Sequence, residues 1–309
     1  MNYTFSETSF PSTDGKHTVY AEIYIPKDRE PVGIVQLAHG MVDYVGRYTA
    51  LADFLTEKGY IFAGNHHLGH GKSVTDESDY GFFGESEGYK FVIDDMYSMN
   101  EYLRKTYPGL PLIVMGHSMG SFITRLYTVK YPDSMSGVII HGTGGKNPAL
   151  PLGKFLTKLL MTFKGPRKRS DLIENLAFGA YNSHFPKSEG KNAWLTRDIQ
   201  SVSGRDDDKY TNFKFTLSGY YDLFTMLGEC NKQAWFDNYP KKLPTLVISG
   251  DADPVGNYGK GPRQVYARLG EAGCEKLTLK MYEGARHELF NEINKDEVFA
   301  DILSWIEGL

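Results

Sequence analysis

The sequence predicts an α/β fold in which a mostly parallel, doubly wound sheet carries an inserted helical cap. Strands alternate with helices along most of the chain, as expected for such a sheet. The segment Gly116–Gly120 has the pattern of a tight strand-to-helix turn. The alternation stops near Gly144 and resumes at Pro244. We therefore expect a sheet domain formed by residues 1–144 and 240–309, with residues 145–239 as the cap.

The first part of the chain predicts antiparallel strands and then a change of rhythm. Residues 3–26 alternate polar and apolar side chains, which indicates strands with one solvated face. Residues 33–38 and 60–64 are short apolar strands. Between them, residues 48–58 have helical spacing.

The middle of the chain continues this alternation. Residues 88–107 predict a long helix, because apolar side chains recur at helical intervals. A strand over 112–115, a helix over 118–130 and a strand over 137–140 follow. After the cap, a strand begins at Pro244, and then come a helix at 263–271, a strand at 276–281 and a helix at 296–306. No internal repeat interrupts this order.

The cap region has two apolar stripes at helical spacing. They comprise Leu152, Phe155, Leu156, Leu159, Leu160 and Phe163, and then Leu217, Tyr220, Tyr221, Phe224 and Leu227. A structureless loop of this length would be unusual, so we expect helices. Core packing is the expected role of most of these side chains, with a subset lining a substrate pocket. The basic run at 164–169 predicts a solvated loop, with attraction to anionic lipid surfaces as the alternative.

Composition excludes several classes of protein. A net charge of −4 gives no electrostatic reason to bind nucleic acid. The N-terminus lacks the basic and apolar regions of a signal peptide, and no apolar run is long enough to span a bilayer. Cys230 and Cys274 form no disulfide framework, which favours a cytoplasmic location. A single bridge between them and the oligomeric state stay open.

Ser118 lies in the pattern of a nucleophile elbow, Gly116-His117-Ser118-Met119-Gly120. Such a turn is too tight for side chains at the flanking positions. It raises the serine oxygen beside the free N–H groups of the following helix. The pattern predicts a serine hydrolase, although a glycine-rich turn whose serine only caps the helix is the alternative.

A serine nucleophile needs a base and a carboxylate, and both are found in the expected order along the chain. The strand ending at Gly250 is followed by Asp251 and Asp253, and the next strand is followed by His287. An oxyanion hole needs two backbone N–H groups. We expect them from Met119, directly after the nucleophile, and from Met41, after an early strand.

These segments resemble the monoacylglycerol lipase and lysophospholipase branch of the α/β-hydrolases, often given the serine aminopeptidase name. The resemblance is carried by segments of the sheet domain, and it is weaker in the cap. They are Ala38–Met41, Gly69–Ser73, Gly116–Gly120, Gly250–Val255 and Glu283–Glu288. It implies an α/β-hydrolase fold and assigns the acid to Asp253, three residues after the glycine that ends the strand. Relatives commonly carry an aspartate where this chain has Asn65–Leu68, which puts one supporting contact in doubt.

The resemblance implies no cofactor and no metal. His39, His66, His67 and His70 are therefore interpreted as structural histidines. It also implies a small ester or lipid substrate such as a monoacylglycerol or lysophospholipid, with transient contact between the cap and a membrane surface left open.

Three alternatives stay open. An aryl or short-chain carboxylesterase would use the same triad. An aminopeptidase would need cap carboxylates for the substrate amine, for which Glu174 and Glu189 are available. A ligand-binding protein that kept the scaffold is disfavoured, because Ser118, Asp253 and His287 are all present.

Overall fold

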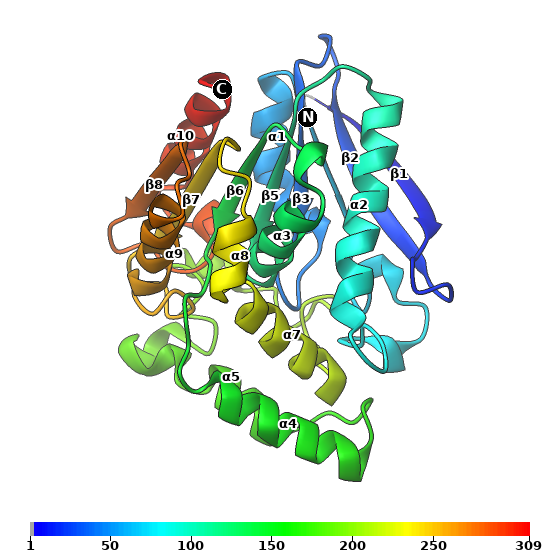
Figure 1. The fold of residues 1–309 in the computed structure, drawn as a ribbon, viewed down its shortest axis with the longest axis vertical. Helices are drawn as coiled ribbons and strands as arrows, with labels where there is room; N and C mark the ends of the chain where they lie inside the picture. Colours follow the sequence, from blue (N-terminus) through cyan, green and yellow to red (C-terminus); the bar gives the residue numbers. More distant parts are fainter. Residues whose placement is uncertain (1–2) are drawn as a thin grey trace.

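Eight strands form one sheet in the computed structural model, which describes residues 3–309 (Figure 1). The strand order is β1-β2-β4-β3-β5-β6-β7-β8. β1 and β2 pair with each other antiparallel, β2 pairs antiparallel with β4, and every later pair is parallel. The bounds are β1 Tyr3–Pro11, β2 Thr18–Pro26, β3 Gly33–Ala38, β4 Tyr60–Asn65, β5 Leu112–His117, β6 Gly137–His141, β7 Thr245–Gly250 and β8 Leu277–Tyr282.

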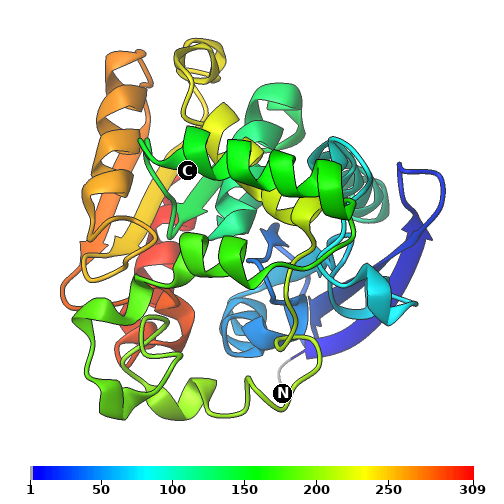
Figure 2. The same ribbon diagram turned by 90° about the horizontal axis from the view of Figure 1, so that it is seen from below.

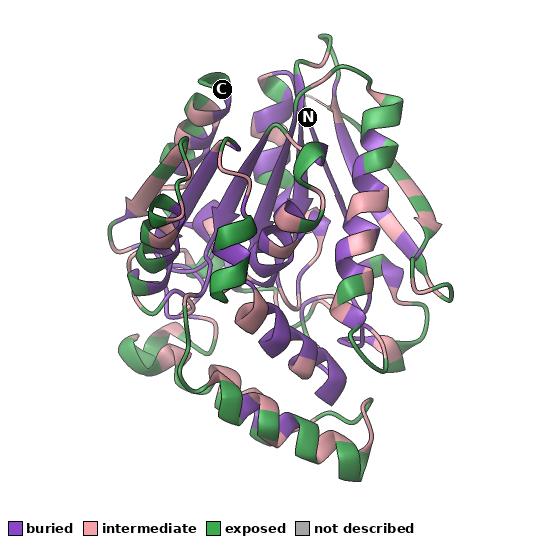
Figure 3. Cartoon of the chain, viewed as in Figure 1, coloured by how far each residue is buried: buried purple, intermediate pink, exposed green. Residues whose placement is uncertain are grey.

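Helices cover both faces of the sheet. Side chains of α1 (Thr49–Glu57) and α10 (Lys295–Glu307) share one apolar core with one face. Those of α2 (Gly88–Thr106), α3 (Met119–Lys130), α8 (Gln233–Asn238) and α9 (Lys260–Glu271) pack on the other. The central strands β3 to β7 are buried along their whole length (Figure 3), as parallel strands covered on both faces must be. The predicted doubly wound α/β-hydrolase fold is confirmed.

The chain leaves the sheet after β6 and returns at β7, and the helices of the intervening segment that precede α8 cover the carboxyl ends of the strands (Figures 1 and 2). These helices are α4 Leu150–Lys164, α5 Asp171–Phe178, α6 Ile199–Val202 and α7 Leu217–Glu229. Short 3₁₀ turns lie at Val45–Tyr48, Gly71–Ser73, Glu77–Asp79, Pro132–Ser134, Tyr181–His184, Lys187–Glu189 and Leu289–Asn291. The insertion therefore lies above the edge of the sheet where the nucleophile turn was expected.

The two apolar stripes of the cap differ in their packing. The stripe on α7 is buried in the core that α7 shares with α2 and α3, as expected. The prediction of core packing is wrong for most of α4, where Leu152, Phe155, Leu159 and Phe163 are exposed. The side of α4 that packs on α7 carries the buried Gly153 and Thr157, together with the partly buried Leu156 and Leu160. Figure 3 shows this exposed outer side of α4.

Candidate active site

Ser118 lies at the sharp turn between β5 and α3. Its backbone has φ 55° and ψ −120°, a conformation that non-glycine residues rarely adopt. A Cβ atom on Gly116 would lie 2.2 Å from the carbonyl oxygen of Gly120, and one on Gly120 would lie 1.9 Å from that of Ala38. The predicted need for glycine on both sides of the serine is therefore confirmed, and the turn has the geometry of a nucleophile elbow.

His287 and Asp253 meet beyond the ends of β8 and β7. The Nδ1 atom of His287 lies 2.9 Å from Oδ2 of Asp253, and both side chains are buried. The other carboxylate oxygen of Asp253 accepts a hydrogen bond from the Val255 N–H at 2.8 Å. Asp251 instead accepts from the Gly284 N–H at 2.7 Å, so it supports the turn that precedes His287. Of the two candidate acids, only Asp253 contacts the imidazole.

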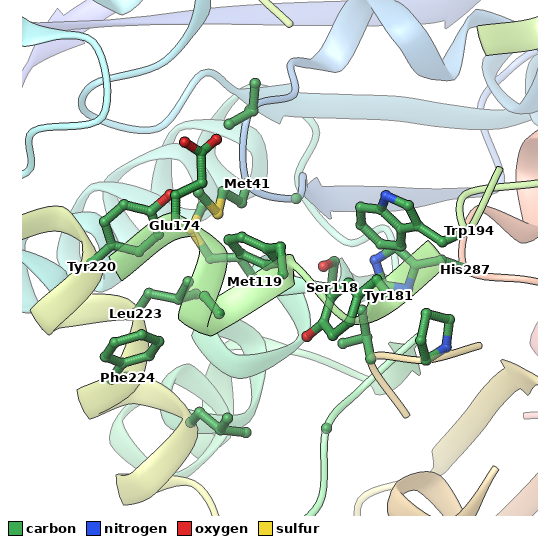
Figure 4. Close-up of a pocket in the computed structure, with 18 of the residues that line it drawn as sticks. Met41, Ser118, Met119, Glu174, Tyr181, Trp194, Tyr220, Leu223, Phe224 and His287 are labelled. Atoms are coloured by element: carbon green, nitrogen blue, oxygen red, sulfur yellow. The ribbon is translucent and has the colours of Figure 1, made fainter. Parts of the chain in front are cut away.

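Ser118 and His287 line one pocket with a volume of about 1630 Å³. Figure 4 shows both side chains in the same part of this pocket, together with Trp194 and Tyr181 from the cap. The rings of Trp194 and His287 lie 5.1 Å apart and are tilted by 32°. Trp194 therefore covers the imidazole, a role that no pattern in the sequence indicated.

The opposite part of the pocket is lined mainly by apolar side chains, with Glu174 beside Tyr220 (Figure 4). Tyr220, Leu223 and Phe224 of α7 lie there (Figure 4), and Phe122 of α3 and Leu227 also contribute. These side chains come from the α7 stripe that the sequence assigned partly to a substrate pocket. An apolar wall in the same pocket as Ser118 is suited to an acyl chain.

Met41 and Met119 also line the pocket. Met119 is the first residue of α3, so its N–H has no acceptor within the helix. Met41 follows Gly40, where a Cβ atom would lie only 3.3 Å from the Cβ of Ser118. Both backbone positions are thus close to the serine, as an oxyanion hole requires.

The histidines after β3 and β4 are buried, and the rings of His39, His66 and His70 are hydrogen-bonded, whereas that of His67 has no partner within residues 3–309. His39 contacts the Gly40 carbonyl at 2.8 Å and accepts from the His67 N–H at 3.1 Å. His66 contacts Glu22 at 3.1 Å. Within residues 3–309, no group of three or more histidine, cysteine or acidic side chains could hold a metal ion. Asn65 is buried, and its amide has no hydrogen-bond partner among the described residues.

His117, directly before Ser118, is buried at the wall of the pocket. Its ring is 4.8 Å from that of His287 and 4.4 Å from that of His141. Burial, together with the neighbouring His287, lowers the pKa of His117 to about 4. His117 is therefore neutral at pH 7 and adds no charge beside Ser118.

A buried ion-pair network follows His287 in the chain. Glu288 contacts Arg47 of the core at 2.8 Å and Arg205 of the cap at 3.1 Å. Burial alone would raise the pKa of Glu288, but the two arginines outweigh it and hold the pKa well below its usual value. Sequence reasoning missed this network, because its members lie far apart in the chain and match no motif.

The two carboxylates considered for an aminopeptidase are both paired. Glu189 binds Arg286 at 2.6 Å, and Glu174, which lines the pocket, binds Lys214 at 2.8 Å. His184 contacts the hydroxyl group of Tyr258. Neither glutamate is a free anion in the pocket, so the arrangement does not favour recognition of a substrate amine.

Two further features considered in the sequence are the pairing of the cysteines and the presence of membrane-spanning helices. Cys230 is buried, Cys274 is half-buried, and both are free thiols. Among the residues that the structure describes, no helix is both long enough and apolar enough to cross a bilayer.

Comparison with known proteins gives a consistent set of relatives. Residues 29–294 match the family model described as serine aminopeptidase, S33. A monoacylglycerol lipase of Mycolicibacterium smegmatis is 29% identical over 321 residues, covering 99% of this chain and 98% of that protein. The human monoglyceride lipase is 26% identical over 310 residues, covering 96% and 92%. A thermostable carboxyl esterase of Bacillus coagulans, solved with glycerol, has a TM-score of 0.91 and 31% identity, covering 99% and 98%.

Proposed function

Because this chain belongs to the serine aminopeptidase, S33, family of α/β-hydrolases, we propose that Ser118, His287 and Asp253 form its catalytic triad. The chain is an ester hydrolase, and we propose monoacylglycerol-type lipids as its substrates. Its relatives include monoacylglycerol lipases and a carboxyl esterase. The observation that carries the proposal is the apolar pocket, which brings Ser118 together with an imidazole bonded to a buried carboxylate.

The proposed reaction is acyl transfer to water. Ser118 attacks the ester carbonyl while Nε2 of His287 accepts the hydroxyl proton. Asp253 holds the imidazole in the tautomer with hydrogen on Nδ1 and stabilises the imidazolium that forms. The N–H groups of Met41 and Met119 stabilise the oxyanion. His287 then protonates the departing alcohol, and water activated by His287 releases the fatty acid from Ser118.

The pocket gives the two parts of a monoacylglycerol different surroundings. The acyl chain lies along the apolar side chains of α7, and the glycerol occupies the polar part near Ser118. Residues 145–239 act as a lid over this pocket in the proposal. The exposed apolar side chains of α4 and of α5, Leu172 and Leu176, contact the lipid surface from which the substrate comes.

Comparison of the wild type with Ser118→Ala tests the triad. The wild type should give a burst of alcohol from an activated ester and release fatty acid from monoacylglycerols, and Ser118→Ala should do neither. Ser98→Ala is the matched control, because the Ser98 hydroxyl only contacts the Asp94 carbonyl on α2. Full activity of Ser118→Ala would overturn the assignment.

A substrate series tests the specificity. Monoacylglycerols of increasing chain length are compared with lysophospholipids, short aryl esters and aminoacyl amides. The proposal requires that kcat/KM be highest for monoacylglycerols and rise with chain length until the apolar part of the pocket is filled. A preference for aminoacyl amides would contradict it.

A further inference from the structure

The loop that carries Met41 contains a strained residue. Val42 has φ 52°, a left-handed conformation that β-branched residues rarely adopt. Such strain persists only where the surrounding structure holds it. Val42 lines the pocket directly after the proposed oxyanion donor, so whatever holds Val42 also affects that donor.

His70 holds the N–H end of Val42. Its Nε2 accepts a hydrogen bond from the Val42 N–H at 3.2 Å, and its Nδ1 lies 3.0 Å from the Leu68 carbonyl. A carbonyl can only accept and an N–H can only donate, so the two contacts require the same neutral tautomer, with hydrogen on Nδ1. Burial of the ring lowers the pKa of His70 to about 4, which keeps Nε2 free to accept at neutral pH.

Arg205 holds the carbonyl end of Val42. Its Nη2 donates to the Val42 carbonyl at 3.0 Å, and its Nη1 donates to Glu288 at 3.1 Å. Arg205 belongs to the cap, whereas Val42 and Glu288 belong to the sheet domain. One guanidinium group thus connects the cap to the oxyanion loop and to the residue after His287.

Three consecutive peptide groups of this loop are therefore fixed. His39 contacts the carbonyl of the Gly40–Met41 peptide at 2.8 Å, His70 holds the Met41–Val42 peptide, and Arg205 holds the Val42–Asp43 peptide. In a trans peptide the N–H points away from the carbonyl. Fixing these groups in sequence sets the direction of the Met41 N–H.

We propose that His70 and Arg205 are positioning residues that hold Val42 from its two ends, so that the sheet domain and the cap together aim the Met41 N–H at the developing oxyanion. This inference rests on the proposed role of Met41 in ester hydrolysis. It means that the oxyanion hole is complete only when the cap segment carrying Arg205 is docked, which couples the cap to the chemical step.

Four variants test the proposal. His70→Phe keeps a ring among the surrounding aromatic side chains but removes the acceptor, and His70→Gln restores an acceptor oxygen. Arg205→Met removes the donor to Val42. Arg197→Met is the control for cap attachment, because Arg197 lies on the same cap segment but binds Glu292 and Asn294 instead.

The kinetic result expected is a fall in kcat with little change in KM. His70→Phe and Arg205→Met should each lower kcat for a soluble ester by about 100-fold, the size of effect that misplaced catalytic groups produce. His70→Gln should recover most of the loss, and Arg197→Met should keep the wild-type kcat. Equal losses in Arg197→Met and Arg205→Met would overturn the proposal, because cap attachment alone would then explain them.

Crystal structures of Arg205→Met and of the double variant His70→Phe/Arg205→Met give a readout that does not depend on activity. We expect φ of Val42 to leave the positive region in the double variant His70→Phe/Arg205→Met, and in Arg205→Met alone if His70→Phe does not fold. Retention of φ near 52° would overturn the inference. An inactive wild type would instead overturn the proposed function, and the Val42 conformation would still decide the positioning role.

Discussion

The Nδ1 atom of His287 lies 2.9 Å from Oδ2 of Asp253, with 2% of the histidine side chain and none of the aspartate side chain exposed. Because both side chains are buried away from solvent, the carboxylate fixes both the orientation and the tautomer of the imidazole. The neighbouring Asp251 instead accepts a hydrogen bond from the Gly284 N–H in the turn before His287. The two aspartates at the end of β7 therefore have separate roles.

Asp253→Asn should lower kcat by roughly 10⁴-fold while leaving the fold intact, since the amide favours the wrong tautomer of the imidazole. Steady-state hydrolysis of a soluble ester measures this loss. Asp251→Asn is the matched control and should retain most of the activity. A larger loss in Asp251→Asn than in Asp253→Asn would show that the acid has been assigned to the wrong residue.

Local patterns in the sequence were sufficient to predict the strands and the turn that position the site. Gly116 and Gly120 predicted the turn because only glycine fits against the backbone there, and short apolar runs predicted the buried strands. The network of Glu288 with Arg47 and Arg205 could not be predicted in this way. Its residues are brought together by the docking of the cap, and an isolated charged residue in a sequence indicates solvent exposure by default.

In the cap, the spacing of apolar residues predicted the helices but not how they pack. It correctly predicted that α4 is a helix, but it could not show which face of that helix is covered. The apolar side chains of α4 predicted core packing, yet only Leu156 and Leu160 of that stripe pack on the core, beside Gly153 and Thr157. A helix whose apolar face contacts a lipid surface has the same sequence pattern as one whose apolar face packs in a protein core.

Gly120→Ala should abolish both activity and the native fold of the nucleophile turn. A Cβ atom there would lie 1.9 Å from the Ala38 carbonyl oxygen, and neither backbone can move without displacing β3 or α3. Gly270→Ala on α9 is the control, because no atom lies within 4 Å of the new Cβ. Thermal unfolding should show Gly270→Ala unchanged or stabilised by up to about 1 kcal/mol. An active, stable Gly120→Ala would contradict the geometry of the elbow.

Glu288→Gln should destabilise the protein by roughly 3 kcal/mol at pH 7, because it leaves the positive charges of Arg47 and Arg205 without their shared buried partner. The pKa of Glu288 in the folded state lies below its usual value of 4.5. Its contribution to stability is therefore complete above pH 4.5 and is lost as the pH falls toward the folded-state pKa. Urea unfolding at several pH values should show the difference between wild type and variant shrinking below pH 4.5.

Asp171→Asn is the control for that experiment, because the Asp171 pair with Lys214 is exposed. Exposed pairs contribute little, so the unfolding free energy of this variant should match that of the wild type at neutral pH. A difference between wild type and Glu288→Gln that stayed constant from pH 7 to pH 3 would contradict the role given to the buried charge.

Phe155→Ser/Phe163→Ser should weaken binding to lipid vesicles without changing the chemistry. These side chains are 63% and 78% exposed on the outer face of α4, and neither lines the pocket. Burying one such side chain in an apolar phase contributes about 1.5–3 kcal/mol, so the double variant should bind vesicles at least about tenfold more weakly.

Vesicle sedimentation measures this binding, and hydrolysis of a soluble ester should stay at the wild-type rate. Phe5→Ser, at an exposed site on β1, should bind like the wild type. If both variants bound vesicles equally well, the cap would not be the lipid-contacting surface, and the exposed face of α4 would need another partner.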